Sequence, residues 1–269
     1  MNFLKRYHFA ALLLLLLVLA CKKNQNPESI VRKPEPPPVK PPVSKILVPI
    51  KLETTGSTLN LKYKGNTGWL TEISDASGTK TIITYTAEQY PSELEKYKNG
   101  NLFYTAYYER ADKKTTSKVI MFETKGSFYT PLGSYTLGYN SLQQFNEVKY
   151  YSHNEQLTKT RTLSYISGNL SEESSTTPPG SADRNTYTFD QKKGISSHIT
   201  YNQILAFEHE HWFLYCTSNN ILSLQNQKSP LENISFSYEY NEDGYPSKMT
   251  ITKNNSVQHI KITYKAIEP

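Results

Sequence analysis

"YNEDGYPSKMTITKNN", residues 240–255, decides the fold prediction because it reads as a turn followed by a strand. Asp-Gly between extended segments is a strong signal for a β-hairpin turn. "YTAEQYPSELEKYKNG", residues 85–100, aligns with it without a gap, and six of the sixteen positions are identical. "YNSLQQFNEVKYYSHN" (139–154) fits the same frame, and "GWLTEI" (68–73) and "GISSHI" (194–199) match its centre in residue type. The sequence therefore predicts about five degenerate copies of one unit.

The alignment decides between helix and strand inside the unit. Alone, "SELEKYKN" (92–99) favours a short helix, because Glu, Leu and Lys are good helix formers. Its counterpart "SKMTITKN" (247–254) favours a strand through Thr-Ile-Thr. Equivalent copies should share one conformation, so we predict a strand in both. The segments that follow, "NLFYTAYYE" (101–109) and "VQHIKITYK" (257–265), supply the second strand of each hairpin.

Tyr-Asn-x-x-Gly-Tyr-Pro before a strand resembles the YD repeat, the tyrosine-rich hairpin unit of Rhs-type proteins. It is more similar still to degenerate repeats in uncharacterised lipoproteins of Bacteroidetes-like Gram-negative bacteria, and the likeness covers residues 60–264. Rhs proteins wrap many tens of repeats around a toxin, a shell that five copies cannot close, and we expect no toxin-like domain here. The resemblance implies the hairpin architecture and not the encapsulating function. The repeat's glycine is kept at Gly68, Gly194 and Gly244. The aspartate that follows the first tyrosine of the repeat is replaced by Asn241, Thr86 or Asn140.

The fold class predicted for residues 50–269 is all-β. We expect an extended antiparallel meander of repeated hairpins that forms a twisted sheet or an open half-barrel. The polar stretch "EESSTTPPGSADRN" (172–185) predicts a long loop between copies. Whether the β body is one sheet or two subdomains stays open at this stage.

The first 49 residues predict export and a lipid anchor. Residues 1–20 read as a signal peptide, with a basic start at Lys5 and Arg6 and an apolar run too short to span a bilayer. The run ends in "LVLAC", which resembles a lipoprotein lipobox with Cys21 as the acylated residue. The alternative is ordinary cleavage that leaves Cys21 unmodified. Residues 21–49 are rich in proline, so they predict an extended tether without a core.

Charge excludes one class of partner. The chain has 30 basic and 24 acidic side chains, but two of the basic ones lie in the signal peptide. Residues 22–49 hold six basic and two acidic side chains, so residues 50–269 hold 22 of each. A balanced body argues against nucleic acid as a partner, whereas a basic tether suits a membrane surface. We expect an outer-membrane lipoprotein with its body in the periplasm, and exposure on the cell surface stays open.

"FEHEHWFLY" (207–215) holds the sharpest candidates for a metal site. On a strand, His209 and His211 would point to one face, and two imidazoles can share a metal. Zinc requires three or four ligands, and only His198 offers a third imidazole through folding. We therefore predict a solvated pair beside Trp212, no metal and no cofactor.

The sequence lacks the usual catalytic motifs. It contains no Gly-x-Ser-x-Gly elbow, no P-loop and no dinucleotide-binding glycine pattern. Cys216, flanked by apolar residues, is interpreted as a small buried side chain rather than a nucleophile. We predict a protein without catalytic activity. The alternative is an envelope hydrolase with its site on the concave face of the sheet.

Aromatic side chains are the main candidates for ligand binding. Aromatic rings with polar neighbours suit glycans and peptides, because they combine flat apolar area with hydroxyl groups. Adjacent tyrosines on a strand must send one ring to each face, so some of them should be exposed. The predicted role is structural or binding, with an envelope protein or a glycan as partner. The candidate residues are Tyr107, Tyr108, Tyr150, Tyr151 and Trp212.

Overall fold

The computed structural model describes residues 45–111, 115–209 and 211–268, and these residues form an antiparallel β structure with a short helical insertion. Strands occupy most of the described chain, and one α-helix and two 3₁₀ turns interrupt them. The elements are β1 (Ile46–Thr54), β2 (Ser57–Tyr63), β3 (Leu70–Asp75), β4 (Thr79–Tyr85), β5 (Pro91–Lys98), β6 (Asn101–Arg110), β7 (Thr116–Lys125), β8 (Phe128–Tyr139), β9 (Phe145–Ser152), β10 (Leu157–Ile166), β11 (Asn169–Thr177), β12 (Ser181–Phe189), α2 (Asn202–Glu208), η1 (Trp212–Tyr215), β13 (Ile221–Asn226), η2 (Pro230–Glu232), β14 (Ile234–Tyr240), β15 (Pro246–Lys253) and β16 (Ser256–Ile267).

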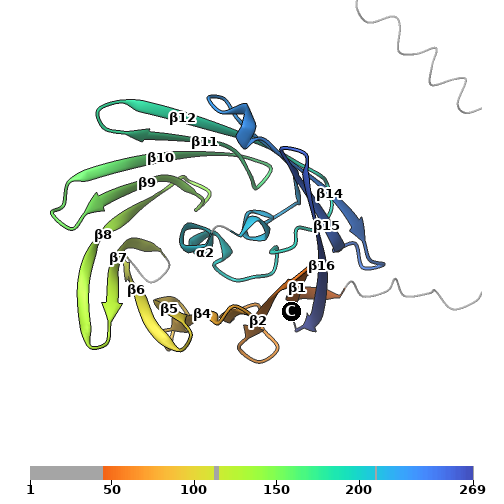
Figure 1. Ribbon diagram of the computed structural model, residues 1–269, viewed down its shortest axis with the longest axis horizontal. Helices are drawn as coiled ribbons and strands as arrows, with labels where there is room; N and C mark the ends of the chain where they lie inside the picture. Colours follow the sequence, from red (N-terminus) through yellow and green to blue (C-terminus); the bar gives the residue numbers. More distant parts are fainter. Residues whose placement is uncertain (1–44, 112–114, 210, 269) are drawn as a thin grey trace, which may run out of the picture. The chain divides into compact units, whose positions relative to one another are not determined.

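The sixteen strands of the described chain form one closed barrel (Figure 1). Each strand pairs with its neighbours in sequence, and β1 pairs with β16 to complete the ring, from Ile46 opposite Ile267 to Glu53 opposite Lys261. The predicted meander is confirmed, but the prediction of an open sheet or half-barrel is wrong. Closure pairs the backbone of both terminal strands, which an open sheet would leave as exposed edges. The body is therefore one sheet.

The barrel wall is apolar inside and polar outside. Along β2, Leu61 is buried against the core while its neighbour Lys62 faces out and pairs with Glu72 at 2.9 Å. The same arrangement of outward charged pairs recurs between β14 and β15, where Lys248 contacts Glu239 at 2.8 Å. This alternation follows from the period of two along each strand. It places the hydrophobic core in the lumen.

Residues 190–209 and 211–220, between β12 and β13, fold into the lumen, and we call them the plug (Figure 1). Ile195, Leu205 and Leu214 of the plug are at most 1% exposed and belong to the same core as the wall. Barrels of sixteen strands are wide enough to hold an aqueous channel, so the width must be filled from within. Within the described residues, no helix is long and apolar enough to cross a bilayer.

Three of the five predicted copies have the predicted form. Residues 85–100, 139–154 and 240–255 each run from the end of one strand, through a five-residue turn, into the next. Residues 91–98 are the strand β5, so the choice of strand over helix is confirmed. Residues 68–73 also enter a strand, β3. Residues 194–199, by contrast, belong to the plug and are no copy of the unit.

The five-residue turns explain the Asp-Gly of the best-preserved copy. The fourth turn residue has a positive φ in all three, +81° at Gly244, 77° at Gln89 and 61° at Gln143. Glycine adopts this conformation without a Cβ clash, whereas other residues are strained there. The turn geometry is therefore conserved between copies even where the glycine is not.

Tyrosine recurs in the unit because its hydroxyl bridges two strands of a hairpin. Tyr85 at the end of β4 donates to the carbonyl oxygen of Leu70 at 2.8 Å, and Tyr139 of β8 donates to that of Thr116 at 2.7 Å. Tyr63 makes the same kind of bond at 2.6 Å in the first hairpin. Each bond satisfies a carbonyl of the preceding strand, and in the first two this carbonyl belongs to the first residue of that strand.

The polar stretch 172–185 is not the loop that its composition predicts. Its residues belong to β11 and β12, which pair from Glu172 opposite Thr186 to Thr177 opposite Ser181. Ser174 and Thr176 alternate with the buried Glu173 and so lie on the polar outer face of the wall. Pro178 to Gly180 alone form the turn.

The two ends of the barrel differ. The turns after β1, β3, β5 and β15 are two or three residues long, and they share what we call the short-turn end. The five-residue turns, the plug connections and the start of β1 share the other end, the plug end. This asymmetry matters for the cavities described below.

Candidate binding surfaces

The predicted aromatic residues are divided between the two faces of the wall. Tyr107 faces out and is 38% exposed, whereas Tyr108 faces the lumen and is 7% exposed. Tyr150 packs in the lumen against Tyr135, with ring centroids 5.5 Å apart, and its neighbour Tyr151 faces out. The predicted split of adjacent tyrosines is thus observed. The side chain of Trp212 lies outside the described part of the structure.

Tyr107 belongs to an outward cluster of rings on β5 to β8, which we call the aromatic platform and define as Tyr97, Tyr107, Phe122 and Tyr129. Tyr107 meets Phe122 edge to face at 5.8 Å, and Phe122 meets Tyr129 in the same way at 6.1 Å. Tyr129 is 49% exposed. These contacts fix the rings against one another while leaving their outer surfaces open to solvent.

Two threonines under the platform show how well it covers the wall. Thr105 and Thr124 face outward, yet they are 0% and 3% exposed, and their hydroxyl oxygens lie 3.3 Å apart. On the outer face, only large neighbouring side chains can shield them, and Thr105 is paired directly with Phe122. The platform is therefore a packed layer on the outside of the barrel and not a set of independent side chains.

Carboxylates border the platform. Tyr97 donates its hydroxyl to Glu95 at 2.9 Å, and partial burial together with Glu95 raises the pKa of Tyr97. Partial burial and then the charge of Glu93 likewise raise the pKa of Tyr107. Both hydroxyls are therefore protonated donors at neutral pH, next to carboxylates that accept. Lys80 lies 5.0 Å from the centre of the Tyr97 ring.

In the lumen, a buried carboxylate fastens the plug to the wall. The side chain of Glu208, the last residue of α2, is 2% exposed and accepts hydrogen bonds from Tyr104 and Tyr135, both at 2.8 Å. Lys96 of β5 lies 3.5 Å from the same carboxylate and donates to the backbone carbonyl of Glu208 at 2.6 Å. Burial, with the carboxylate second, raises the pKa of Tyr104 and Tyr135.

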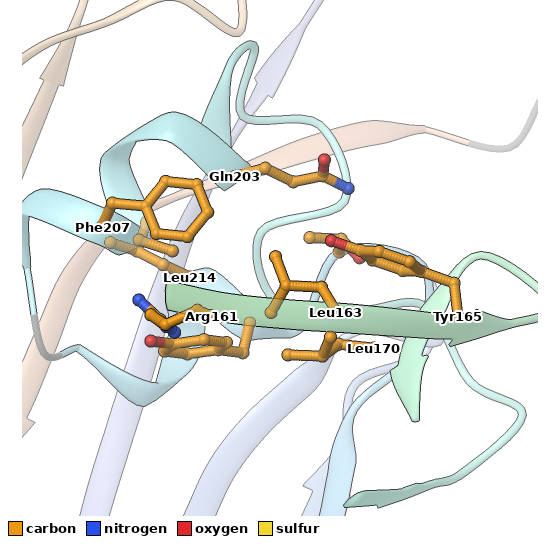
Figure 2. A pocket seen from close by; sticks show the side chains of 10 residues that line it. Arg161, Leu163, Tyr165, Leu170, Gln203, Phe207 and Leu214 are labelled. Carbon is orange, nitrogen blue, oxygen red and sulfur yellow. The ribbon is translucent and has the colours of Figure 1, made fainter. Parts of the chain in front are cut away.

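A second buried pair lies where the plug meets β10 and β11. Arg161 donates two hydrogen bonds of 2.8 Å to Glu173, and its guanidinium lies 5.2 Å from the ring centre of Phe207 in the plug. Figure 2 shows Phe207 and Leu214 from the plug facing Leu163 and Arg161 from the wall. The cavity between them measures about 30 Å³, room for a single water molecule.

These contacts bear on the hydrolase alternative. The concave face of the sheet is the lumen, and the plug packs against it. Of its carboxylates, Glu208 is held by tyrosines and lysine, and Glu173 is held by arginine. Both act as structural acceptors in this arrangement, so the geometry favours no catalytic role for them.

The two histidines do not lie on a strand. His209 follows α2 and His211 precedes η1, and their rings stack at 5.4 Å between centroids. His198 packs against Tyr245 instead, 6.0 Å between ring centroids. Among the described residues, no group of three or more His, Cys, Asp or Glu side chains is arranged to hold a metal. The prediction of a strand here is wrong because this segment completes the plug.

The structure describes one of the two cysteines, Cys216. Cys21 lies outside the described residues, so its lipidation stays a prediction. Cys216 in the plug is 1% exposed, and burial raises the pKa of its thiol to about 12. A thiol with so high a pKa is a poor nucleophile, in keeping with its interpretation as a small buried side chain.

Several residues of these surfaces escaped the sequence analysis. Tyr97 and Phe122 become neighbours of Tyr107 only once the register of β5 to β7 is known. The period of two along those strands carried part of this signal. Glu208 and Lys96 are 112 residues apart, and no sequence pattern indicated that they are in contact.

No protein-family model matches the chain, and no curated protein matches it in sequence. Among solved structures it is similar to a porin-like protein from Bacteroides uniformis ATCC 8492, with a TM-score of 0.52 and 13% identity, over 83% of this chain and 97% of that chain. A structure of TcdB2-TccC3-Cdc42 overlaps 78% of this chain and 14% of that chain, with a TM-score of 0.35 and 12% identity. At this identity, the first likeness shows the barrel fold alone.

Proposed function

We propose that the protein is a non-catalytic binding protein of the cell envelope and that its aromatic platform binds a glycan. The observation that carries the proposal is the position of Tyr107, half-exposed among packed rings and next to carboxylates. Flat apolar rings stack on the CH faces of sugars, and neighbouring hydroxyl and carboxylate groups bond to sugar hydroxyls. The barrel serves as the rigid support of this surface.

The polar outer wall supports a scaffold rather than a pore. Barrels that span membranes carry an outward apolar band about 25 Å tall. This barrel instead carries exposed charged pairs on its outside, such as Lys62 with Glu72 and Lys149 with Glu147. Its lumen is occupied by the plug. Both features favour a barrel that stands in water.

The envelope location rests on the N-terminal sequence. Cys21 as a lipidated residue, with the residues that precede β1 as a tether, would hold the barrel near an outer membrane. Replacement Cys21→Ser should release the protein from the membrane fraction into the periplasmic extract. Retention of the variant in the membrane fraction would contradict the anchor.

The relation to YD repeats belongs to the proposal as well. Three hairpins share the five-residue turn, and the strand-bridging tyrosine recurs at Tyr63, Tyr85 and Tyr139. Recurrence of both features in one chain supports a repeated hairpin unit of the YD type.

The glycan proposal can be tested with purified protein and defined envelope glycans. We expect binding of peptidoglycan or lipopolysaccharide oligosaccharides on a glycan array, followed by calorimetric titration of the best hit. Tyr107→Ala should weaken that binding at least tenfold, which corresponds to about 1.4 kcal/mol. Tyr151→Ala is the matched control, because Tyr151 also faces out but lies on β9, beyond the platform.

Two results would refute the proposal. One is equal binding by the wild-type protein and folded Tyr107→Ala. The other is loss of binding in Tyr151→Ala alone. A third outcome is that the wild-type protein binds no glycan but captures an envelope protein, and that Tyr107→Ala does not capture this protein. That outcome would show that the platform recognises a protein instead of a glycan.

A further inference from the structure

The plug leaves a recess in the lumen at the short-turn end, beside β1 to β4 and β15 to β16. Two adjoining cavities of about 230 and 110 Å³ occupy it, and Leu59, Asp75 and His211 belong to the walls of both. Ser57 and Gln258 line the larger cavity and are exposed, so it opens to solvent between them. The recess lies inside the wall, whereas the aromatic platform lies outside.

The larger cavity is mainly apolar. Its apolar walls belong to strands from both ends of the sequence and to η1, so its shape depends on barrel closure. At about 30 Å³ for a water-sized group, 230 Å³ holds a chain of roughly seven or eight such groups. The apolar lining residues are Leu52, Leu59, Phe213, Met249, Ile251 and Ile260.

The smaller cavity is the polar end of the recess. His209 and His211 line it together with Asp75, Ser74 and two threonines of β4. Nε2 of His209 is buried and has no hydrogen-bond partner among the described residues. A buried polar atom without a partner costs free energy, so this atom is where a bound ligand would gain a hydrogen bond.

The charges around the polar end favour an uncharged ligand head. Burial, reinforced by Lys96, lowers the pKa of His209 to about 3, and burial also lowers that of His211, so both imidazoles are neutral at pH 7. The charge of Lys96 is balanced by Glu208 at 3.5 Å. Asp75 carries the remaining charge in the recess wall, and its Oδ1 already accepts from Ser77 and Thr79. A carboxylate head would be repelled by Asp75. An ammonium head would gain little from Asp75, because Lys98 and the bonds from Ser77 and Thr79 already compensate that charge, and it would lose its own hydration.

We propose that this recess binds a neutral amphiphile, a medium-length acyl chain with a hydroxylated head, in the manner of a monoacylglycerol. The chain occupies the larger cavity, and the head hydroxyls bond to His209 Nε2 and the polar side chains beside it. The proposal stands on the cavities and the unpartnered imidazole, and it is independent of glycan binding at the platform.

Titration calorimetry on the full chain carrying Cys21→Ser tests the proposal, with 1-octanoylglycerol kept below its critical micelle concentration. We expect saturable one-to-one binding, and binding at least tenfold weaker for sodium octanoate and for octylammonium chloride. Equal or tighter binding of either charged probe overturns the neutral head. The lack of saturable binding by 1-octanoylglycerol overturns the site.

Two pairs of variants locate the binding. Ile251 alternates with the buried Met249 and faces the larger cavity, whereas Val257 is 55% exposed and lies opposite Thr252 on the outer face. Ile251→Trp should weaken binding at least tenfold, and Val257→Trp should leave it within twofold. Since Ile251→Trp risks misfolding, Gln258→Trp at the exposed mouth provides a second block with the same expected loss. Full binding by folded Gln258→Trp overturns the location.

His209→Phe removes the unpartnered Nε2 and should weaken 1-octanoylglycerol binding about fivefold or more. Unchanged affinity would show that the head does not use this atom and would overturn that part of the proposal. Tyr107→Ala should bind the amphiphile as the parent does. Failure of glycan binding and failure of amphiphile binding can therefore be told apart.

Discussion

Glu208 gives the sharpest prediction about stability, because one carboxylate joins the plug to the barrel wall. Its two oxygens accept from Tyr104 and Tyr135 at 2.8 Å, and Lys96 lies 3.5 Å away, all around a side chain that is 2% exposed. Hydrogen bonds to a charged group contribute about 1.5–3 kcal/mol each. In Glu208→Gln one neutral bond remains, one tyrosine hydroxyl faces an amide donor, and Lys96 loses its counter-charge.

We therefore expect Glu208→Gln to lower the free energy of unfolding by about 2–4 kcal/mol. Urea unfolding followed by circular dichroism measures this, and the midpoint temperature should fall by roughly 5–15 °C for a domain of this size. The control is Glu172→Gln, which removes the outward pair with Arg184 and should cost no more than about 1 kcal/mol.

A double-mutant cycle separates the contribution of the Tyr104–Glu208 hydrogen bond from unrelated effects of each substitution on stability. Tyr104→Phe and Glu208→Gln should couple by at least about 1 kcal/mol, because they remove the same hydrogen bond. A change within about 0.5 kcal/mol for Glu208→Gln would refute the reasoning, since no buried charged acceptor could then be holding the plug.

Three further predictions follow from single positions. Gln89 and Gly244 both have a positive φ, which glycine adopts without strain. Gln89→Gly should therefore raise the free energy of unfolding by about 0.5–1 kcal/mol, and Gly244→Ala should lower it by about as much. Urea unfolding measures both changes. Gly68→Ala should lower the midpoint temperature by several degrees, since its Cβ would lie 2.0 Å from the backbone oxygen of His198 in the plug. The pKa of His209, lowered by burial to about 3 from 6.5, means that the unfolded chain takes up a proton below pH 6.5 that the folded chain refuses. As the pH decreases below 6.5, this site should lower the free energy of unfolding by about 1.4 kcal/mol per pH unit. Between pH 7 and pH 5, the free energy of unfolding of His209→Gln should decrease less than that of the wild-type protein.

Local features of the fold were within reach of the sequence. The strand β5 was predicted against its own helix propensity, because the gapless match to residues 247–254 carried information that the segment lacks alone. The split of Tyr107 from Tyr108 followed from the period of a strand. A repeat and a period of two can both be read from a sequence without knowing which strands pair.

Barrel closure and the plug could not be predicted from the sequence, for a physical reason. A hairpin unit specifies its own turn and pairing, but the meeting of β1 with β16 depends on curvature summed over the whole ring. Residues 172–185 read as a loop because polar wall strands lack apolar alternation, and pairing with their neighbours makes them a hairpin. The segment 207–215 alternates like a strand but fills the lumen as helix and 3₁₀ turn.

The candidate surfaces show the same limit. Tyr107 was identified as a binding candidate, but its platform partners lie on three different strands. The recess at the short-turn end needs β1 to β4, β15, β16 and η1 together, and no local pattern brings these elements into view. The recess is therefore a product of closure, whereas the platform depends on the register of four consecutive strands.

Closure is the central structural claim, because it encloses the plug and shapes the recess, and an engineered disulfide tests it directly. Glu53 on β1 and Lys261 on β16 are paired on the outer face, so their Cα atoms lie about 4.5–5.5 Å apart, within disulfide range. In the Cys21→Ser background, Glu53→Cys with Lys261→Cys should form an intramolecular disulfide under mild oxidation, seen by mass spectrometry of the linked peptides. Glu53→Cys with Lys248→Cys, one strand further along the ring at about 9–10 Å, should not. Two free thiols in the first pair, or equal crosslinking in both, would contradict the closed barrel.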